Sequence, residues 1–336
     1  MEDKRLLFRI RNLKKYFPLK KRSFLQREVG SVRAIDNINF DIYEGETLSI
    51  VGESGCGKST LGRTILQLYK PTEGTVEYFG SRLSSGGPVG LQSLHVTQMR
   101  KYRKDMQLIF QDPYSALNPY MTVGQMIAEG LQAQSMLERE PKKNREYIFS
   151  IMEQCGLPPE VAHGYPHQFS AQQRRRISIA RSLALRPVFI IADEPVSDLD
   201  APFRSRILNL LLELKRDHGL TYMLTFSDLS LTKYISDRVG VMFEGTIVEL
   251  AESTALHALP IHPYTEALLL ATPSSERRRK GRTRILEGNT TSSLPLPSGC
   301  AFYSRCKYAT QICREKAPMF KEHRPNHYVA CHHPLG

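Results

Sequence analysis

The stretch Gly52-Glu53-Ser54-Gly55-Cys56-Gly57-Lys58-Ser59 decides the fold of this chain. A glycine, four further residues, a Gly-Lys pair and a serine have the spacing of a phosphate-binding loop, and we call residues 52–59 the phosphate loop. The apolar run 47–51 before it predicts a buried strand, and Leu61, Ile65 and Leu68 share one face of a helix after it. In this setting backbone N–H groups converge on an anion at a helix N-terminus, which a glycine turn without a ligand would not require.

Side chains at two places have a direct chemical role in this interpretation. Lys58 would reach the β- and γ-phosphates of a nucleotide, and the Ser59 hydroxyl would bind Mg²⁺. Asp193 and Glu194 follow the apolar run 188–192. An acid at such a strand end can hold Mg²⁺ through water, and a second carboxylate beside it can polarise an attacking water. The alternative for this acidic pair is a strand-end charge exposed to solvent.

Strands alternate with helices along much of the chain, which favours a largely parallel sheet. Ligands of such sheets bind at the carboxyl ends of the strands. Gly57, Gln111, Asp193 and Ser227 each follow the end of a candidate strand, and we therefore expect them in one site. Gln111 would contact both the metal ion and the attacking water, as glutamines do in other nucleotide hydrolases.

The composition limits the class of protein. The chain has 336 residues, of which 41% are hydrophobic, so it can bury a core and hold two domains. No apolar run approaches the ~18 residues of a membrane helix, and the N-terminus does not read as a signal peptide. We expect a cytosolic chain that reaches a membrane through partners. The net charge of +12 includes the run Arg277-Arg278-Arg279-Lys280, which favours a linker or a face near anionic lipid over nucleic-acid binding.

The periodicity divides the chain into a main domain over residues 1–273, a basic linker over 274–284 and a cysteine-rich extension over 285–336. Between residues 121 and 157 the period is helical and predicts two or three helices. Ser170 is a suitable N-cap for a further helix that would run through Ala184.

Six cysteines occur, and four of them lie within the last 37 residues: Cys300, Cys306, Cys313 and Cys331. Four thiolates suit a tetrahedral zinc ion or an iron–sulfur cluster, although the lack of a close Cys-x2-Cys pair weakens the zinc interpretation. Reduced structural cysteines are the third alternative. His327, His332 and His333 are near enough in sequence to serve as substitute ligands.

Several further stretches belong to one family pattern: Tyr16-Phe17-Pro18, 51–60, 109–113, Leu117-Asn118-Pro119, Tyr165-Pro166-His167, 190–200 and the terminal cysteine segment. Over essentially its whole length the chain resembles the ATPase subunit of an ABC importer of the oligopeptide, dipeptide or nickel type. The opening 13–18 is similar to the second, or F-type, ATPase of such a pair. The resemblance implies an α/β fold: a P-loop NTPase (RecA-like) core with a mostly parallel sheet, an N-terminal antiparallel β subdomain, an inserted helical subdomain over about 113–185, and a small irregular cysteine-rich C-terminal extension.

The resemblance also implies a role for each matching position. Phe17 or Tyr16 would stack on adenine. The residues around the phosphates of ATP would be Gly52, Glu53, Ser54, Gly55, Cys56, Gly57, Lys58, Ser59 and Thr60. Mg²⁺ would be held by Ser59, Gln111 and Asp193. Glu194 would be the catalytic base, with Gln111 as the Q-loop. The D-loop would be Ser197, Asp198, Leu199 and Asp200. For the terminal cysteines the resemblance favours a four-iron four-sulfur cluster, with Zn²⁺ as the alternative.

Two positions depart from the family pattern. The signature Leu-Ser-Gly-Gly-Gln is here Phe169-Ser170-Ala171-Gln172-Gln173, and Gln172 places a long side chain where close backbone approach is expected. Ser227 stands at the place of the switch histidine, and a serine does not titrate near neutral pH. Ser227 would act on the ATP of its own phosphate loop, whereas the signature would act on the ATP of a partner subunit.

The resemblance implies a motor subunit that hydrolyses ATP at the cytoplasmic face of the cell membrane. Its partners would be a sister ATPase in a heterodimer, two transmembrane permease subunits and an extracytoplasmic substrate-binding protein, and no nucleic acid. One alternative is a nucleotide-binding regulatory subunit of the same complex with weak hydrolysis, which the two departures favour. Another is a soluble ABC protein unrelated to transport, but such proteins carry two cassettes or a long coiled coil, and this chain has one cassette and no heptad run.

Overall fold

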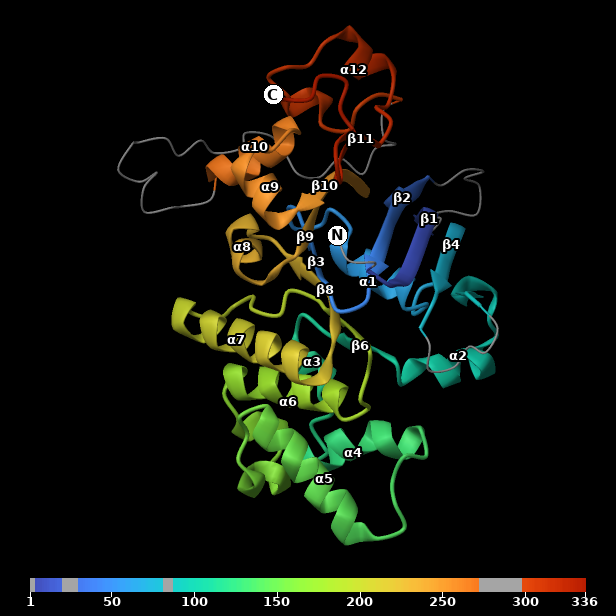
Figure 1. Ribbon diagram of the computed structural model, residues 1–336. Coiled ribbons are helices and arrows are strands. Elements are labelled where there is room, and N and C mark those ends of the chain that lie inside the picture. The colour runs from blue at the N-terminus through green and yellow to red at the C-terminus, as the bar shows by residue number, and fades with distance from the viewer. Residues whose placement is uncertain (1–3, 20–29, 81–86, 272–297) are drawn as a thin grey trace. The chain divides into compact units, whose positions relative to one another are not determined.

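The computed structural model describes residues 4–19, 30–80, 87–271 and 298–336. The predicted basic linker over 274–284, with its run Arg277–Lys280, lies outside the described residues. The chain separates into two compact units (Figure 1). Unit 1 comprises Met1–Phe79, Ser84–Ser93 and Phe226–Gly336, and unit 2 comprises Gly80–Leu83 and Leu94–Thr225.

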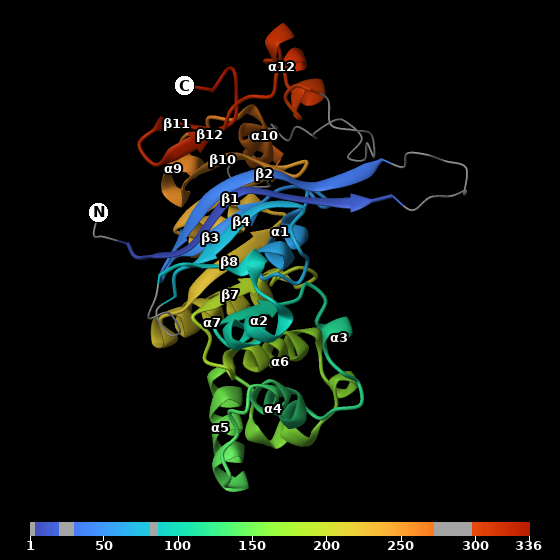
Figure 2. The same cartoon turned by 90° about the vertical axis from the view of Figure 1, so that its right-hand side faces the viewer.

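Unit 1 contains an antiparallel sheet with the strand order β2-β1-β4-β5. Its strands are β1 (Leu6–Pro18), β2 (Ser31–Tyr43), β4 (Glu73–Tyr78) and β5 (Val89–Gly90). Figure 2 shows β1, β2 and β4 side by side, as their pairing requires. Phe8 and Ile10 of β1 are fully buried, because alternate side chains of a strand point to one face. The antiparallel N-terminal sheet that the resemblance implied is therefore present.

A second set of strands in unit 1 has the order β11-β12-β10-β9-β3. The strands are β3 (Thr47–Val51), β9 (Arg238–Phe243), β10 (Thr246–Glu252), β11 (Lys321–Arg324) and β12 (His327–Val329). β3 pairs with β9 in parallel, whereas β9, β10, β12 and β11 pair antiparallel in that sequence. The sheet is therefore mixed. All five residues of β3 are buried, as expected for the strand before the phosphate loop.

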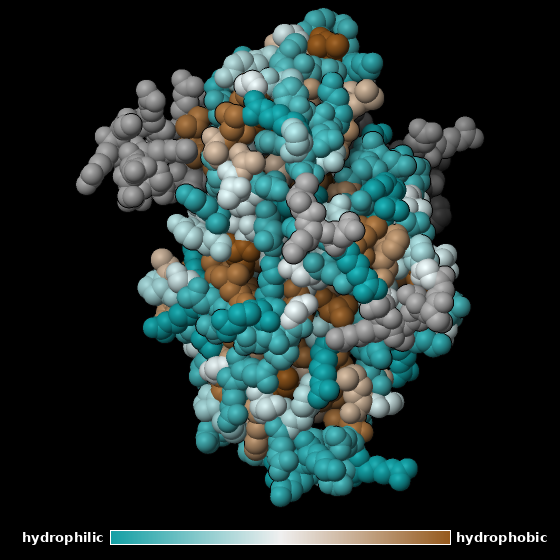
Figure 3. All heavy atoms as spheres, viewed as in Figure 1, coloured by the Kyte–Doolittle hydropathy of each residue, from teal (hydrophilic) through white to brown (hydrophobic). Residues whose placement is uncertain are grey.

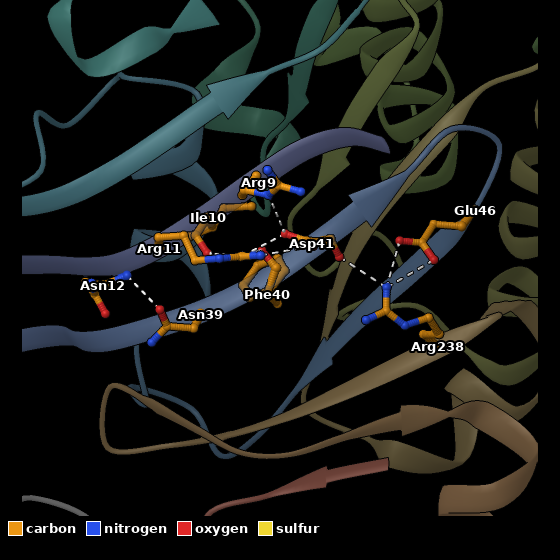
Figure 4. Close-up of polar contacts among 9 residues, drawn as sticks. All are labelled: Arg9, Ile10, Arg11, Asn12, Asn39, Phe40, Asp41, Glu46 and Arg238. Carbon is orange, nitrogen blue, oxygen red and sulfur yellow. Dashed lines mark hydrogen bonds and ion pairs between the residues drawn. The ribbon is translucent and has the colours of Figure 1, made fainter. Parts of the chain in front are cut away.

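Helices and 3-10 turns complete unit 1: η1 (Leu91–Ser93), α1 (Lys58–Ile65), η4 (Leu229–Leu231), α8 (Thr232–Ile235), α9 (Ser253–Ala258), α10 (Pro263–Ala271), η5 (Tyr303–Arg305) and α12 (Gln311–Glu315). Charged side chains connect its two sheets (Figure 4). Asp41 on β2 accepts from Arg11 on β1, and its backbone carbonyl accepts from Arg238 on β9 at 3.1 Å. Arg238 also pairs with the buried Glu46 at 3.1 Å, so one guanidinium joins the antiparallel sheet to the mixed one.

Unit 2 is built on three parallel strands in the order β8-β7-β6. These are β6 (Met106–Ile109), β7 (Phe189–Ala192) and β8 (Thr221–Phe226, whose last residue belongs to unit 1). The candidate strands expected to end before Gln111, Asp193 and Ser227 are present, and they end at Ile109, Ala192 and Phe226. Helix α7 (Ala201–His218) connects β7 to β8 and buries Leu210, Leu211 and Leu214. Unit 2 also contains α2 (Val96–Arg103), and His95 forms a capping box at its N-terminus.

The rest of unit 2 is helical, as Figure 1 shows: α3 (Pro113–Ala116), α4 (Val123–Ala133), α5 (Pro141–Gln154), η2 (Pro159–His163), η3 (Pro166–Gln168) and α6 (Ala171–Leu183). Helices α4 and α5 confirm the two or three helices predicted between residues 121 and 157. The apolar face of α4 is buried: Val123, Met126, Ile127 and Leu131. Ser170 is the N-cap of α6 and its hydroxyl accepts from the Gln173 N–H, which confirms the predicted helix start.

On the face shown in Figure 3, hydrophobic residues form separate patches among hydrophilic ones. In the part of the chain that the structure describes, no helix combines the length and the apolar character needed to cross a membrane.

Candidate functional site

The phosphate loop lies between β3 and α1 and depends on glycine at close backbone approaches. Gly57, the N-cap of α1, has φ 111°, a left-handed conformation that other residues rarely adopt. A Cβ atom on Gly57 would lie 2.2 Å from the carbonyl oxygen of Ala34, and one on Gly52 would lie 2.1 Å from that of Met242. Larger residues would thus push the loop away from the strands that support it.

Lys58 is held inside the phosphate loop. Its side chain is buried, and Nζ donates to the carbonyl oxygens of Gly52 at 2.7 Å and Glu53 at 3.0 Å. Ser54 and Gly55 are exposed at the tip, and Ser59 is half-buried at the start of α1. Burial raises the pKa of Cys56, so this thiol stays protonated and acts as a small packing group. A cation and a helix N-terminus therefore lie where a polyphosphate would bind.

The two aromatic residues that we expected to contact adenine differ in their surroundings. The Tyr16 hydroxyl donates to Asp36 at 2.7 Å, and Arg33 lies over its ring. Burial and this hydrogen bond raise the pKa of Tyr16 to about 12. Phe17 packs edge-on against the Tyr69 ring. Both are half-buried, so either ring keeps an accessible part for a planar ligand.

In unit 2 the acidic pair after β7 is organised by a threonine that the sequence interpretation did not single out. The Thr225 hydroxyl on β8 donates to Asp193 Oδ1 at 2.7 Å and accepts from the Glu194 N–H at 2.9 Å. Thr225 is fully buried and Asp193 is 2% exposed. Glu194 has φ 43°, and such strained backbone is found preferentially at functional sites. The sequence did offer one signal for this role, because Thr225 lies near the end of the strand next to β7.

Gln111 follows β6 and is exposed. The backbone there is held by Arg175 of α6, whose guanidinium donates to the carbonyl oxygens of Phe110 at 2.8 Å and Gln111 at 2.7 Å. Burial lowers the pKa of Arg175, which the carboxylates around it oppose. The Asp193 N–H donates to the Ile109 carbonyl, so the ends of β6 and β7 lie next to each other. The structure thus brings Gln111, Asp193 and Glu194 to adjoining strand ends of unit 2.

The signature and D-loop residues also belong to unit 2. Ala171 is exposed in the first turn of α6, Phe169 and Gln172 are half-buried, and Gln173 completes the capping box with Ser170. In the D-loop the Ser197 hydroxyl donates to the Glu194 carbonyl at 3.0 Å. The remaining D-loop positions are the exposed Asp198 at φ 59°, the buried Leu199 and Asp200 at the start of α7. Ser227, in unit 1, is exposed directly after β8.

The prediction of an iron–sulfur cluster was wrong. The four cysteines line one pocket of unit 1: Cys300, Cys306, Cys313 and Cys331. Nevertheless, among the described residues no group of three or more His, Cys, Asp or Glu side chains could hold a metal ion, so the structure gives the zinc alternative no support either. Burial raises the pKa of Cys300, Cys306 and Cys331, the last to about 11, so these thiols are neutral when no metal is bound.

Comparisons with known proteins agree with this geometry. The chain matches the ABC transporter family over residues 35–197 and the oligopeptide/dipeptide transporter C-terminal region over residues 248–313. The oligopeptide transport ATP-binding protein AppF of Bacillus subtilis is 44% identical over 97% of both chains. The putative oligopeptide transport ATP-binding protein YkfD of the same organism is 43% identical over 90% of both. The solved dimeric ATP-binding cassette MJ0796, bound to ADP and Pi, is 26% identical with a TM-score of 0.63, covering 74% of this chain and 99% of that one.

A phosphate loop at the start of a helix and an acidic strand end define a P-loop nucleotide-binding protein. More narrowly, the chain belongs to the ABC transporter ATPases, in the group of the oligopeptide transport ATP-binding proteins. The resemblance to an oligopeptide-type ABC importer ATPase, which the sequence indicated, is confirmed. The ABC ATPase fold is confirmed as well. Membership in this family implies ATP with Mg²⁺ as the ligand.

Proposed function

We propose that this chain is the ATP-hydrolysing motor subunit of a peptide importer. The observation that carries the proposal is the intact phosphate loop with Lys58 held inside it. The buried contacts among Thr225, Asp193 and Glu194 in unit 2 support it further. So do relatives that are named for oligopeptide transport and match nearly the whole chain.

In this proposal residues 1–273 carry the cassette, with a helical subdomain at about 113–185. Ser59, Gln111 and Asp193 hold Mg²⁺, which neutralises charge on the phosphates. Glu194 orients and activates water, and Lys58 and the loop N–H groups bind the phosphates. Tyr16 or Phe17 contacts adenine. Ser227 offers a hydroxyl to the same ATP, whereas the residues from Phe169 to Gln173 and the D-loop act across a dimer. The donor set fits Mg-ATP, since hydroxyl, amide and carboxylate oxygens are the ligands that Mg²⁺ prefers.

The proposed partners are a sister ATPase in a head-to-tail heterodimer, two transmembrane permease subunits and, through the complex, an extracytoplasmic substrate-binding protein. The chain would then be bound peripherally at the cytoplasmic face of the membrane. Support comes from the names of the relatives, which describe ATP-binding proteins of oligopeptide transport, and from their match over nearly the whole chain.

A second candidate is a subunit that binds ATP and hydrolyses it weakly while its partner turns over. Ser227 and the altered signature favour it, because Ala171 and Gln172 occupy the first turn of α6, where backbone N–H groups would face the partner's phosphates. Restoring the histidine with Ser227→His should raise phosphate release from the reconstituted heterodimer under this candidate. An unchanged rate would favour a motor that tolerates the serine.

The test of the main proposal is calorimetric titration of the full chain with Mg-ATP. The wild type should bind Mg-ATP. The Lys58→Ala variant should no longer retain the nucleotide, because the cation that faces the phosphates is gone. Lys142→Ala removes an exposed lysine of α5, whose side chain is 88% exposed, and serves as the matched control. A wild type without ATP binding, or a Lys58→Ala variant with wild-type affinity, would overturn the proposal.

A further inference from the structure

The phosphate loop is contacted by a residue from the other end of the chain. Arg305 donates to both carboxylate oxygens of Glu53, with Nη1–Oε2 and Nη2–Oε1 distances of 2.9 and 2.7 Å. The two residues are 252 positions apart. Their side chains are only 10% and 21% exposed, so solvent screens this pair less than a surface ion pair. A two-point contact of this kind fixes orientation as well as charge.

Arg305 is itself firmly placed. It ends η5 in the C-terminal segment, residues 298–336, and its guanidinium carbon lies 5.6 and 5.8 Å from the ring centres of Phe243 and Phe302. Phe302 is buried against Phe243 and Tyr264 at centroid distances of 5.3 Å each. The guanidinium is therefore stacked on aromatic rings, which keeps it from following Glu53 if the loop moves.

The C-terminal segment is anchored to unit 1 at a second place. Strand β12 pairs with β10, and the buried Glu249 of β10 accepts from His327 of β12 at 2.7 Å. Glu249 also accepts from the backbone N–H groups of Ile261 and His262, at the entry to α10. The segment that carries Arg305 is thus held to the same sheet that supports the phosphate loop.

Glu53 is contacted through its backbone as well as its side chain. Its N–H donates to the Tyr264 hydroxyl at 3.1 Å, and its carbonyl accepts from Lys58 Nζ at 3.0 Å. The residue that Arg305 holds is therefore one of the two whose carbonyls hold the lysine of the phosphate loop. A shift of Glu53 would move Lys58 directly.

The charge of Glu53 matters for an anionic ligand. A carboxylate in a phosphate-binding loop repels a polyphosphate unless a cation compensates it. Glu244 lies in the same neighbourhood, where burial raises its pKa and Arg305 opposes that rise. The carboxyl groups of Glu53 and Glu244 therefore both lie near the Arg305 guanidinium, which supplies the compensating positive charge.

We propose that the C-terminal segment is a working part of the nucleotide site, in which Arg305 is a positioning residue that neutralises and orients Glu53 of the phosphate loop. This inference rests on the proposed function, because it concerns the affinity of the same loop for Mg-ATP. It assigns to the C-terminal segment control over ATP binding: displacement of η5 releases Glu53 and lowers the affinity of the loop for ATP.

The experiment is calorimetry of the full chain with Mg-ATP at low and high salt. Arg305→Met keeps most of the stem that packs on the rings but leaves Glu53 uncompensated, and we expect the Kd to rise about tenfold, the equivalent of one charged hydrogen bond. The rise should shrink at high salt, which screens the repulsion. Arg305→Lys should recover part of the affinity. Adding Glu53→Gln to Arg305→Met should recover most of it, since the repelling charge is then absent.

Lys307→Met is the matched control, because Lys307 lies in the same C-terminal segment but pairs with Glu266 of α10 instead of with the phosphate loop. It should leave the Kd unchanged. If Arg305→Met binds ATP like the wild type, or if the double variant is no better than Arg305→Met, the inference is refuted and the pair only holds the segment in place. Failure of the proposed function is distinct, because the wild type itself would then bind no ATP.

Discussion

The Thr225→Val substitution tests whether one hydroxyl organises the acidic strand end. The two side chains have nearly the same shape, so the change replaces the hydroxyl with a methyl group of similar size. Two hydrogen bonds are lost, one to the carboxylate of Asp193 and one from the N–H of Glu194. A bond to a charged group is worth about 1.5–3 kcal/mol and a neutral one about 1 kcal/mol, so the free energy of unfolding should fall by about 3 kcal/mol.

The same substitution should slow ATP hydrolysis by the reconstituted heterodimer. Glu194 would lose the contact that holds its backbone, and misplacement of a catalytic group by about 1 Å can cost on the order of 100-fold in rate. We therefore expect kcat to fall about 10- to 100-fold. The Kd for Mg-ATP should rise by a smaller factor, because Asp193 loses a hydrogen bond while Lys58 and the phosphate loop are untouched.

The assays are urea unfolding followed by far-UV circular dichroism, since the chain has no tryptophan, and steady-state phosphate release. The control is Tyr222→Phe on the same strand, which removes a buried hydroxyl without a hydrogen-bond partner among the described residues. It should be neutral or slightly stabilising. If Thr225→Val matches Tyr222→Phe in both unfolding midpoint and kcat, the hydroxyl does not position the acidic pair.

Two further predictions concern stability. Burial lowers the pKa of His262 to about 4, against about 6.5 in an unfolded chain. Acidification from pH 6.5 to 4 therefore protonates this histidine only in the unfolded state, and it should reduce the free energy of unfolding by at most about 3 kcal/mol. His262→Gln should remove this contribution, and equal pH slopes for variant and wild type in urea unfolding would contradict it. Arg175→Met should cost about 2–4 kcal/mol, because the carbonyls of Phe110 and Gln111 lose charged donors, whereas the exposed Arg145→Met should cost almost nothing. Urea midpoints that coincide for these two variants would refute that reasoning.

Local sequence patterns were sufficient wherever one short stretch determines its own structure. The phosphate loop follows from its glycines, because only glycine fits the left-handed backbone and close approach at Gly57. The buried face of α4 and the Ser170 cap of α6 follow from helical periodicity and from hydrogen bonding within a few residues. Gln111 and Asp193 could be placed together because adjoining parallel strands end at one edge of a sheet.

Other features depended on residues that the fold brings together from distant parts of the chain. Strand β12 consists of three residues, too few to show a period, and it forms because β10 offers a free edge for pairing. The spacing of the four cysteines suggested a metal site, but whether thiols become ligands depends on their local packing and charge. The contacts of Arg305 with Glu53 and of Thr225 with Asp193 likewise could not be predicted from the sequence. The first depends on how a distant segment packs, and the second depends on the order of the strands in the sheet.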